Sequence, residues 1–112
     1  MPENFPHLDP LVHAPARLHI LSLLAHADEL DFLFLLHATH LTRGNLSSHL
    51  SKLEQAGYIH VEKTFRGKYP LTLYRLSDRG REALRTYHQA MQSILDGLKP
   101  VLAPTRKRKR KP

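Results

Sequence analysis

Cysteine is absent from this 112-residue sequence, and its absence limits the chemistry that the chain can perform. Without thiols, the chain has no disulfide framework and no thiol redox centre. Long hydrophobic runs are also missing, because no apolar stretch approaches the roughly 18 residues of a membrane-spanning helix. The first residues, MPENFPHLDP, are polar and interrupted by proline, which argues against a signal peptide. We therefore expect a cytoplasmic protein of one domain, with no part in a membrane.

The sequence patterns of catalytic and metal sites are missing as well. There is no Gly-rich phosphate loop, no pair of carboxylates in an apolar setting and no Ser/His/Asp arrangement around a strand–turn–helix. The glycines fall at predicted turns and helix ends, with Gly44 as the exception. Nine histidines allow a zinc site with nearby carboxylates, but no pair of them stands in a known metal-binding motif. We predict a protein that is not an enzyme and has no metal or cofactor.

The net charge of +7 is unevenly distributed along the chain. Residues 1–98 hold ten basic and ten acidic side chains, so the whole excess lies in residues 99–112. Within the neutral part, residues 1–42 have a net charge of −4, whereas residues 43–85 have nine basic and four acidic side chains. A basic surface confined to one segment is what phosphate binding requires.

The stretch LTRGNLSSHLSKLEQAGY predicts one short helix, about residues 43–56, with both of its ends marked. The Thr42 hydroxyl can accept a hydrogen bond from the free N–H of Asn45, as N-caps do. Gly57 follows the helix, where a positive φ is often needed. An apolar stripe with helical spacing faces the core and consists of Leu46, Leu50 and Leu53.

The opposite face of this helix is polar, and its one carboxylate, Glu54, lies at the edge. Such a face can enter the major groove of DNA, where polar side chains read base edges or hold phosphates. An ordinary solvated helix surface is the alternative interpretation. His49, at the edge of the apolar stripe, is open to two roles, packing and DNA contact. The predicted DNA contacts are Thr42, Arg43, Asn45, Ser47, Ser48 and Lys52.

A basic hairpin is predicted directly after this helix. Residues 59–65 and residues 71–76 have strand-like patterns, and the turn Arg66–Pro70 between them contains a glycine. At the tip, Arg66 and Lys68 would contact the DNA backbone or minor groove, or else remain solvated. Tyr69 would bind a phosphate or pack on the base of the hairpin.

The runs LTRGNLSSHLSKLEQAGYI and EKTFRGKYPLTLYRLSDRGREAL resemble winged helix-turn-helix regulators of the MarR and ArsR type. The resemblance covers roughly residues 10–95. It implies an α+β, mostly helical fold with a two-stranded wing and a long C-terminal dimerisation helix. It also implies binding to double-stranded DNA and control of transcription, most often repression. The chain differs from the metal-sensing members because it has no cysteine for their thiolate sites.

Two further helices are expected before the helix of residues 43–56, which is the predicted recognition helix for DNA. The first spans residues 10–27, with Asp9 as a possible N-cap and the main helix starting at Pro15. Its buried side chains are predicted to be Leu18, Ile20, Leu21 and Leu24. Asp31 would cap the second helix, residues 32–39. Its inward side chains are predicted to be Leu33 and Leu36, with Phe32 as a further candidate.

Ser77 is predicted to cap a last helix, residues 78–98, about 30 Å long at ~1.5 Å per residue. Apolar side chains recur at alternating spacings of three and four, which is typical of a helix–helix seam. We expect this seam to form a homodimer, although a helix folded back on its own core is the alternative. An effector, if there is one, would bind between the first and last helices. The predicted interface consists of Leu84, Tyr87, Met91, Ile94 and Leu98.

The chain thus divides into an N-terminal arm (residues 1–9), a winged helix domain (10–98) and a disordered basic tail (99–112). Six adjacent basic residues in the tail repel one another, and we expect them to add nonspecific phosphate attraction or solubility. The predicted function is that of a dimeric, sequence-specific transcriptional regulator. Two alternatives are a winged helix that binds other proteins and a nonspecific, architectural DNA-binding module.

Overall fold

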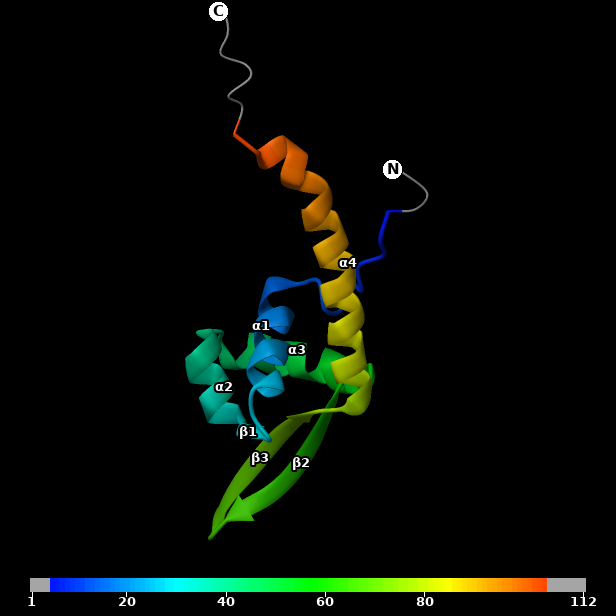
Figure 1. Ribbon diagram of the computed structural model, residues 1–112. Coiled ribbons are helices and arrows are strands. Elements are labelled where there is room, and N and C mark those ends of the chain that lie inside the picture. Colours follow the sequence, from blue (N-terminus) through cyan, green and yellow to red (C-terminus); the bar gives the residue numbers. More distant parts are fainter. Residues whose placement is uncertain (1–4, 105–112) are drawn as a thin grey trace, which may run out of the picture.

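The computed structural model describes residues 5–104, and the six adjacent basic residues of the predicted tail lie outside this range. Within it, four helices and three strands follow one another (Figure 1). The elements are α1 (Pro15–Ala25), β1 (Leu30–Asp31), α2 (Phe32–Thr39), α3 (Arg43–Gln55), β2 (Ile59–Arg66), β3 (Tyr69–Leu76) and α4 (Asp78–Leu102).

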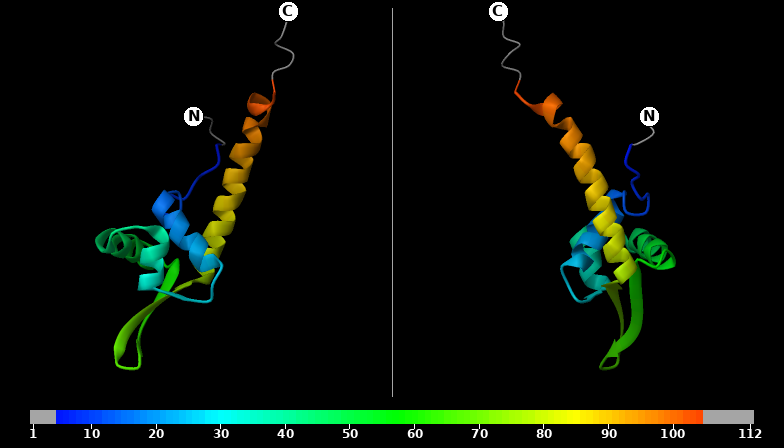
Figure 2. Two further views of the ribbon diagram at one scale, coloured as in Figure 1. Left: turned by 90° about the vertical axis from the view of Figure 1, so that its left-hand side faces the viewer. Right: turned by 45° about the vertical axis from the view of Figure 1, so that its right-hand side comes forward.

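Helices α1, α2 and α3 form a compact body, from which two elements project in opposite directions. The β2–β3 hairpin extends from one side of the body, and α4 extends from the other (Figures 1 and 2). This arrangement is a winged helix, so the predicted α+β, mostly helical class is confirmed. None of the helices in residues 5–104 is both long enough and apolar enough to cross a membrane.

The wing is the predicted two-stranded hairpin, β2–β3. The sheet as a whole has three antiparallel strands in the order β1–β3–β2, and β1 was not predicted. Strand β1 adds a short pairing, in which Leu30 lies opposite Tyr74. Two residues are too few to show the alternating pattern of a strand, so only the tertiary pairing reveals it. The hairpin is also longer than predicted, because β2 and β3 continue to Arg66 and Tyr69 and leave a two-residue turn.

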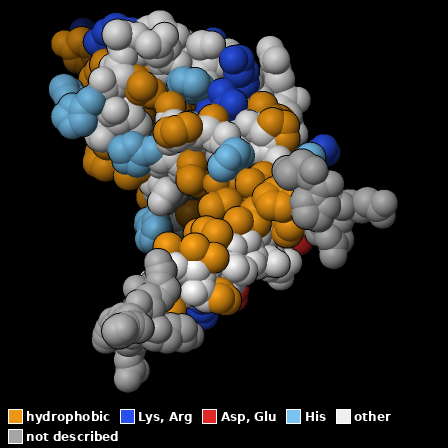
Figure 3. Space-filling view, turned by 90° about the horizontal axis from the view of Figure 1, so that it is seen from above, with side chains coloured by type: hydrophobic (Ala, Val, Ile, Leu, Met, Phe, Trp, Pro, Cys, Tyr) orange, Lys and Arg blue, Asp and Glu red, His pale blue; other side chains and the backbone are white. Residues whose placement is uncertain are grey.

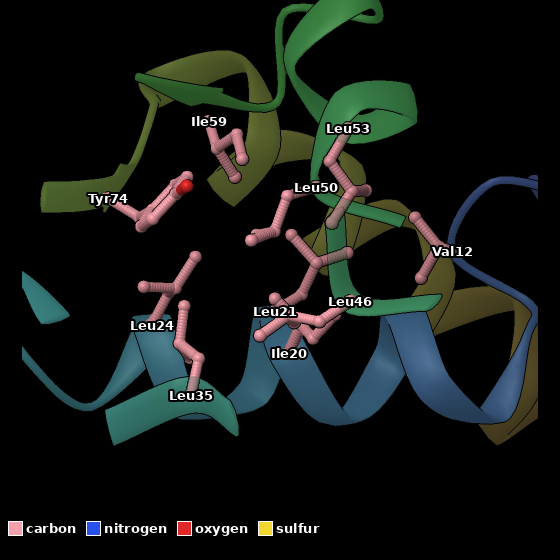
Figure 4. Close-up of a cluster of buried hydrophobic side chains, with 10 residues drawn as sticks. All are labelled: Val12, Ile20, Leu21, Leu24, Leu35, Leu46, Leu50, Leu53, Ile59 and Tyr74. Atoms are coloured by element: carbon pink, nitrogen blue, oxygen red, sulfur yellow. The ribbon is translucent and has the colours of Figure 1, made fainter. Parts of the chain in front are cut away.

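The hydrophobic core lies where α1, α2 and α3 meet the base of the sheet (Figure 4). Burying each large aliphatic side chain stabilises the fold by about 1.5–3 kcal/mol. Because three of the core leucines come from α3, that helix is fixed to the body along one face. The buried side chains are Val12, Ile20, Leu21, Leu24, Leu35, Leu46, Leu50, Leu53, Ile59 and Tyr74.

The inward side chains of α1 and α2 agree with the prediction in part. In α1, three of the four predicted side chains are buried, whereas Leu18 is only half-buried. In α2, Leu36 and Phe32 pack against the core as predicted, whereas Leu33 is 52% exposed and the fully buried residue is Leu35. The sequence FLFLL at the start of α2 is apolar on all sides, so its periodicity does not define a face.

Helix α1 begins at Pro15, where its main part was predicted to start, and ends at Ala25, two residues before the predicted end. Asp9 instead stabilises a separate turn, where its carboxylate accepts from the N–H of Leu11 and its carbonyl accepts from the N–H of His13. This turn leads the N-terminal segment past α4 into α1.

Helix α4 begins as predicted, with the Ser77 hydroxyl accepting from the N–H of Gly80. It continues to Leu102, however, so residues 99–102 are helical and do not belong to a disordered tail. Pro100 lies in its last turn, where the missing N–H removes one intrahelical hydrogen bond. Gly97 lies inside the helix, so its assignment to a helix end was wrong.

Candidate nucleic-acid interface

The position of α3 is fixed by its two ends and by its buried face. At the start, the Thr42 hydroxyl accepts from the N–H of Asn45 at 3.1 Å, as predicted. At the end, Gly57 adopts a φ of 81°, and the N–H of Tyr58 donates to the carbonyl of Leu53 at 2.9 Å. These bonds form a Schellman ending, which satisfies carbonyls that the helix leaves free. With its leucines buried, α3 turns its polar face outward.

All the predicted DNA contacts on α3 and its N-cap are exposed in the structure: Thr42, Arg43, Asn45, Ser47, Ser48 and Lys52. They differ in their surroundings. The guanidinium of Arg43 lies 5.9 Å from the ring centre of Phe32, a cation–π distance that orients it beside α2. Ser47 faces the wing and lines a channel between α3 and the hairpin. The polar face is therefore accessible as a whole, although Ser47 lies at its border.

His49 packs against the body. Its Nδ1 lies 3.2 Å from a guanidinium nitrogen of Arg17, and the same guanidinium donates to the carbonyls of Leu11 and Pro10. Burial lowers the pKa of His49, and the positive charges of Arg17 and Lys52 lower it further. Arg17 thus links α3 to the turn before α1. The sequence alone does not reveal this positioning residue, because His49 is 32 residues away from it.

The wing tip presents all three of its predicted contact residues to solvent. Gly67 has a φ of 61°, which its missing Cβ permits in this tight turn. Lys68 is exposed next to it, and Tyr69 is 77% exposed, so Tyr69 does not pack on the base of the hairpin. Arg66 also forms an ion pair of 3.8 Å with Asp31. The carboxylate of Asp31 therefore caps α2 and also pairs with a cation of the wing.

The predicted position of an effector, between α1 and α4, contains a small cleft. Its volume is about 320 Å³, and it lies beside His13 and Leu18 on one side and Tyr87 on the other. The ring of His13 approaches the Tyr87 hydroxyl to 2.9 Å. In residues 5–104, no three histidine or acidic side chains are close enough together to hold a metal ion.

The arrangement of an exposed polar helix beside a basic hairpin defines the chain as a winged helix protein with a surface suited to DNA. Residues 16–95 match the family model of the winged helix DNA-binding domain. The chain belongs to this family.

Known proteins are similar to this chain in sequence and in fold. An uncharacterised protein of Methanocaldococcus jannaschii is 31% identical over 77 residues, which cover 69% of this chain and 84% of that protein. A transcriptional regulator homologue from Pyrococcus horikoshii is 30% identical, with a TM-score of 0.72 over 80% of this chain and 88% of its own. A MarR family regulator from Silicibacter pomeroyi shares the fold, with 20% identity and a TM-score of 0.59 over 88% of this chain and 65% of its own.

Proposed function

We propose that the protein is a sequence-specific, DNA-binding transcriptional regulator that acts as a homodimer, most simply as a repressor. One observation carries the proposal: α3 is fixed by its leucines while its polar face and the basic wing tip remain exposed. In this arrangement α3 enters the major groove, and the wing reaches the neighbouring backbone or minor groove. Occupying a promoter in this way would block transcription.

Two residues near the middle of the polar face, Ser48 and Lys52, are best placed to touch DNA. They lie one turn apart on α3, and both are exposed. Asn45, one turn before Ser48, is exposed as well and can bond to adenine. The proposed backbone contacts from the wing are Arg66, Lys68 and Tyr69.

The proposed dimer rests on the exposed part of α4. Leu84 and Tyr87 pack against the core of the same chain, whereas Leu98 is 43% exposed and Val101 is 75% exposed. Hydrophobic side chains form a band on the face toward which α4 projects, with histidines around it (Figure 3). A second copy related by a two-fold axis would cover this band and place two α3 helices on one duplex.

The test is selection of bound duplexes from a random DNA pool by the full chain, followed by sequencing. We expect an enriched palindrome with half-sites about 34–36 Å apart. The double variant Ser48→Ala plus Lys52→Ala should lose this binding. Its control, Ser93→Ala plus Lys99→Ala, removes the same groups from α4, where both are exposed, and should retain it. Binding that depends on salt but enriches no sequence would instead indicate an architectural protein, and no binding would indicate a protein-interaction module.

A further inference from the structure

A polar channel of about 280 Å³ runs between α3 and the wing. Ser47 and Ser51 of α3 form one wall of the channel. Lys63 and Thr72 form the opposite wall, and they lie directly across from each other in the β2–β3 ladder. The channel thus brings one ammonium group and three hydroxyl groups together from three separate elements.

The charge of Lys63 is available for a ligand. Its side chain is exposed, and the ion pairs within residues 5–104 are those of Arg66, Arg85 and Lys99, none of which involves Lys63. Ammonium and hydroxyl groups are among the side-chain donors that proteins use to hold phosphate oxygens. The outer part of the channel therefore has the chemistry of a phosphate site.

The opposite part of the channel has a different charge. Glu54 lies there, close enough to Tyr74 that its negative charge, together with the larger effect of burial, raises the pKa of the Tyr74 hydroxyl. Tyr74 pairs with Val61, two residues closer to the base of the hairpin than the Lys63–Thr72 pair. A phosphate is thus repelled at the base and attracted at the level of Lys63.

The geometry of DNA indicates which part of a duplex would lie in the channel between α3 and the wing. If α3 lies in a major groove and the wing lies in the adjacent minor groove, one sugar–phosphate strand separates the two grooves. That strand has to pass between α3 and the wing, which is where the channel lies. We propose that the channel holds the backbone of one DNA strand, with Lys63 as the cation that binds its phosphate. This inference rests on the proposed function and adds a contact residue to it.

Phe65 extends the same wall toward the wing tip. It lies two residues beyond Lys63 on the same face of β2, and it is 68% exposed. An apolar ring at this position would pack on the deoxyribose next to the bound phosphate. The wall therefore matches both parts of a sugar–phosphate backbone.

The experiment compares Lys63→Gln with Arg75→Gln on the selected duplex. Arg75 is an exposed cation of the same hairpin, but it lies on the opposite face of the sheet, across from His60. We expect Lys63→Gln to weaken binding, to reduce the slope of log affinity against log salt by about 1 and to leave the enriched sequence unchanged. The Arg75→Gln variant should match the wild type.

A second measurement locates the phosphate. Each phosphate of the duplex is replaced in turn by an uncharged methylphosphonate. One replacement in each half-site should weaken the wild type and Arg75→Gln but should have no effect on Lys63→Gln. Equal behaviour of the two variants, or a changed sequence preference in Lys63→Gln, would overturn the proposal while the wild type still binds. Failure of the wild type to bind any selected duplex would instead overturn the proposed function, and this inference with it.

Discussion

At the scale of single residues, Gly80 has the least room of the five glycines. It lies in the first turn of α4, against the backbone of the Tyr58 segment. A Cβ added there would lie 2.1 Å from the carbonyl oxygen of Tyr58, so no side chain fits without a shift of the backbone. Gly97, in the same helix, has nothing within 4 Å of an added Cβ.

These two glycines give a matched prediction. The substitution Gly80→Ala should lower the free energy of unfolding by about 3 kcal/mol or more, because it overpacks a rigid contact. Gly97→Ala should raise it by about 0.5–1 kcal/mol, because alanine favours the helix. Urea unfolding of both variants measures the difference. Equal stabilities of the two variants would show that α4 does not pack closely on the Tyr58 segment.

The lowered pKa of His49 predicts that the stability of the fold depends on pH. Burial and the neighbouring charges lower its pKa below the ordinary 6.5, so the folded protein binds fewer protons than the unfolded chain. The free energy of unfolding should therefore fall as the pH drops through 6.5, and this contribution should stop changing below the folded pKa. We expect His49→Gln to lose less Tm than the wild type between about pH 7.5 and about pH 5.5. The control is the exposed His60→Gln. A fall in His49→Gln as large as that in both other proteins would contradict the assignment.

At the scale of elements, the caps of α3 and α4 differ in how many segments they join. Ser77 is only 5% exposed, and its hydroxyl donates to the carbonyl of Gly57 at 2.6 Å while it accepts from the N–H of Gly80 at 2.9 Å. It therefore joins the end of α3 to the start of α4. Thr42 accepts a single hydrogen bond at an exposed position.

The two caps should differ in their contribution to stability. Ser77→Ala should cost about 2 kcal/mol, because it leaves the buried N–H of Gly80 and the part-buried carbonyl of Gly57 without partners. Thr42→Ala should cost about 1 kcal/mol, since water can replace the lost bond. Denaturant midpoints with unchanged m-values measure both, with the exposed Ser93→Ala as a control. A smaller loss for Ser77→Ala than for Thr42→Ala would show that the junction is more hydrated than the structure indicates.

At the scale of the whole molecule, the proposed dimer couples α4 to DNA recognition. Ile94 lies on the predicted seam, beyond the residues that pack on the chain's own core. A carboxylate at this position would be buried between two copies without a partner. Ile94→Asp should therefore produce a monomer and weaken binding to the full palindrome by about 100-fold, because two linked half-sites bind more tightly than one.

The measurement combines sedimentation equilibrium with DNA titration. Ser93→Asp adds the same charge one residue earlier, at an exposed position outside the seam, and should remain a dimer. A monomeric Ile94→Asp that keeps full affinity for the palindrome would refute the link between dimerisation and DNA binding. The salt slope of the same titrations, after removal of residues 105–112, would measure the expected phosphate attraction of the basic tail.

The sequence by itself determined the order of the helices, the hairpin and three of the caps. Thr42, Asp31 and Ser77 each cap the helix that was predicted for them. Such caps, the apolar stripe of α3 and the glycine after it act over a few residues, so their signals can be read locally. The exposed polar face of α3 follows from the same stripe.

Only the tertiary structure decided the features that depend on residues far apart in the chain. Strand β1 exists because it pairs with β3, and Leu35 is the core residue of α2 because of how that all-apolar helix packs. The contact of Arg17 with His49 and the channel beside Lys63 likewise join separate elements. Periodicity within one element does not specify which neighbour it meets, and that neighbour determines these parts of the site.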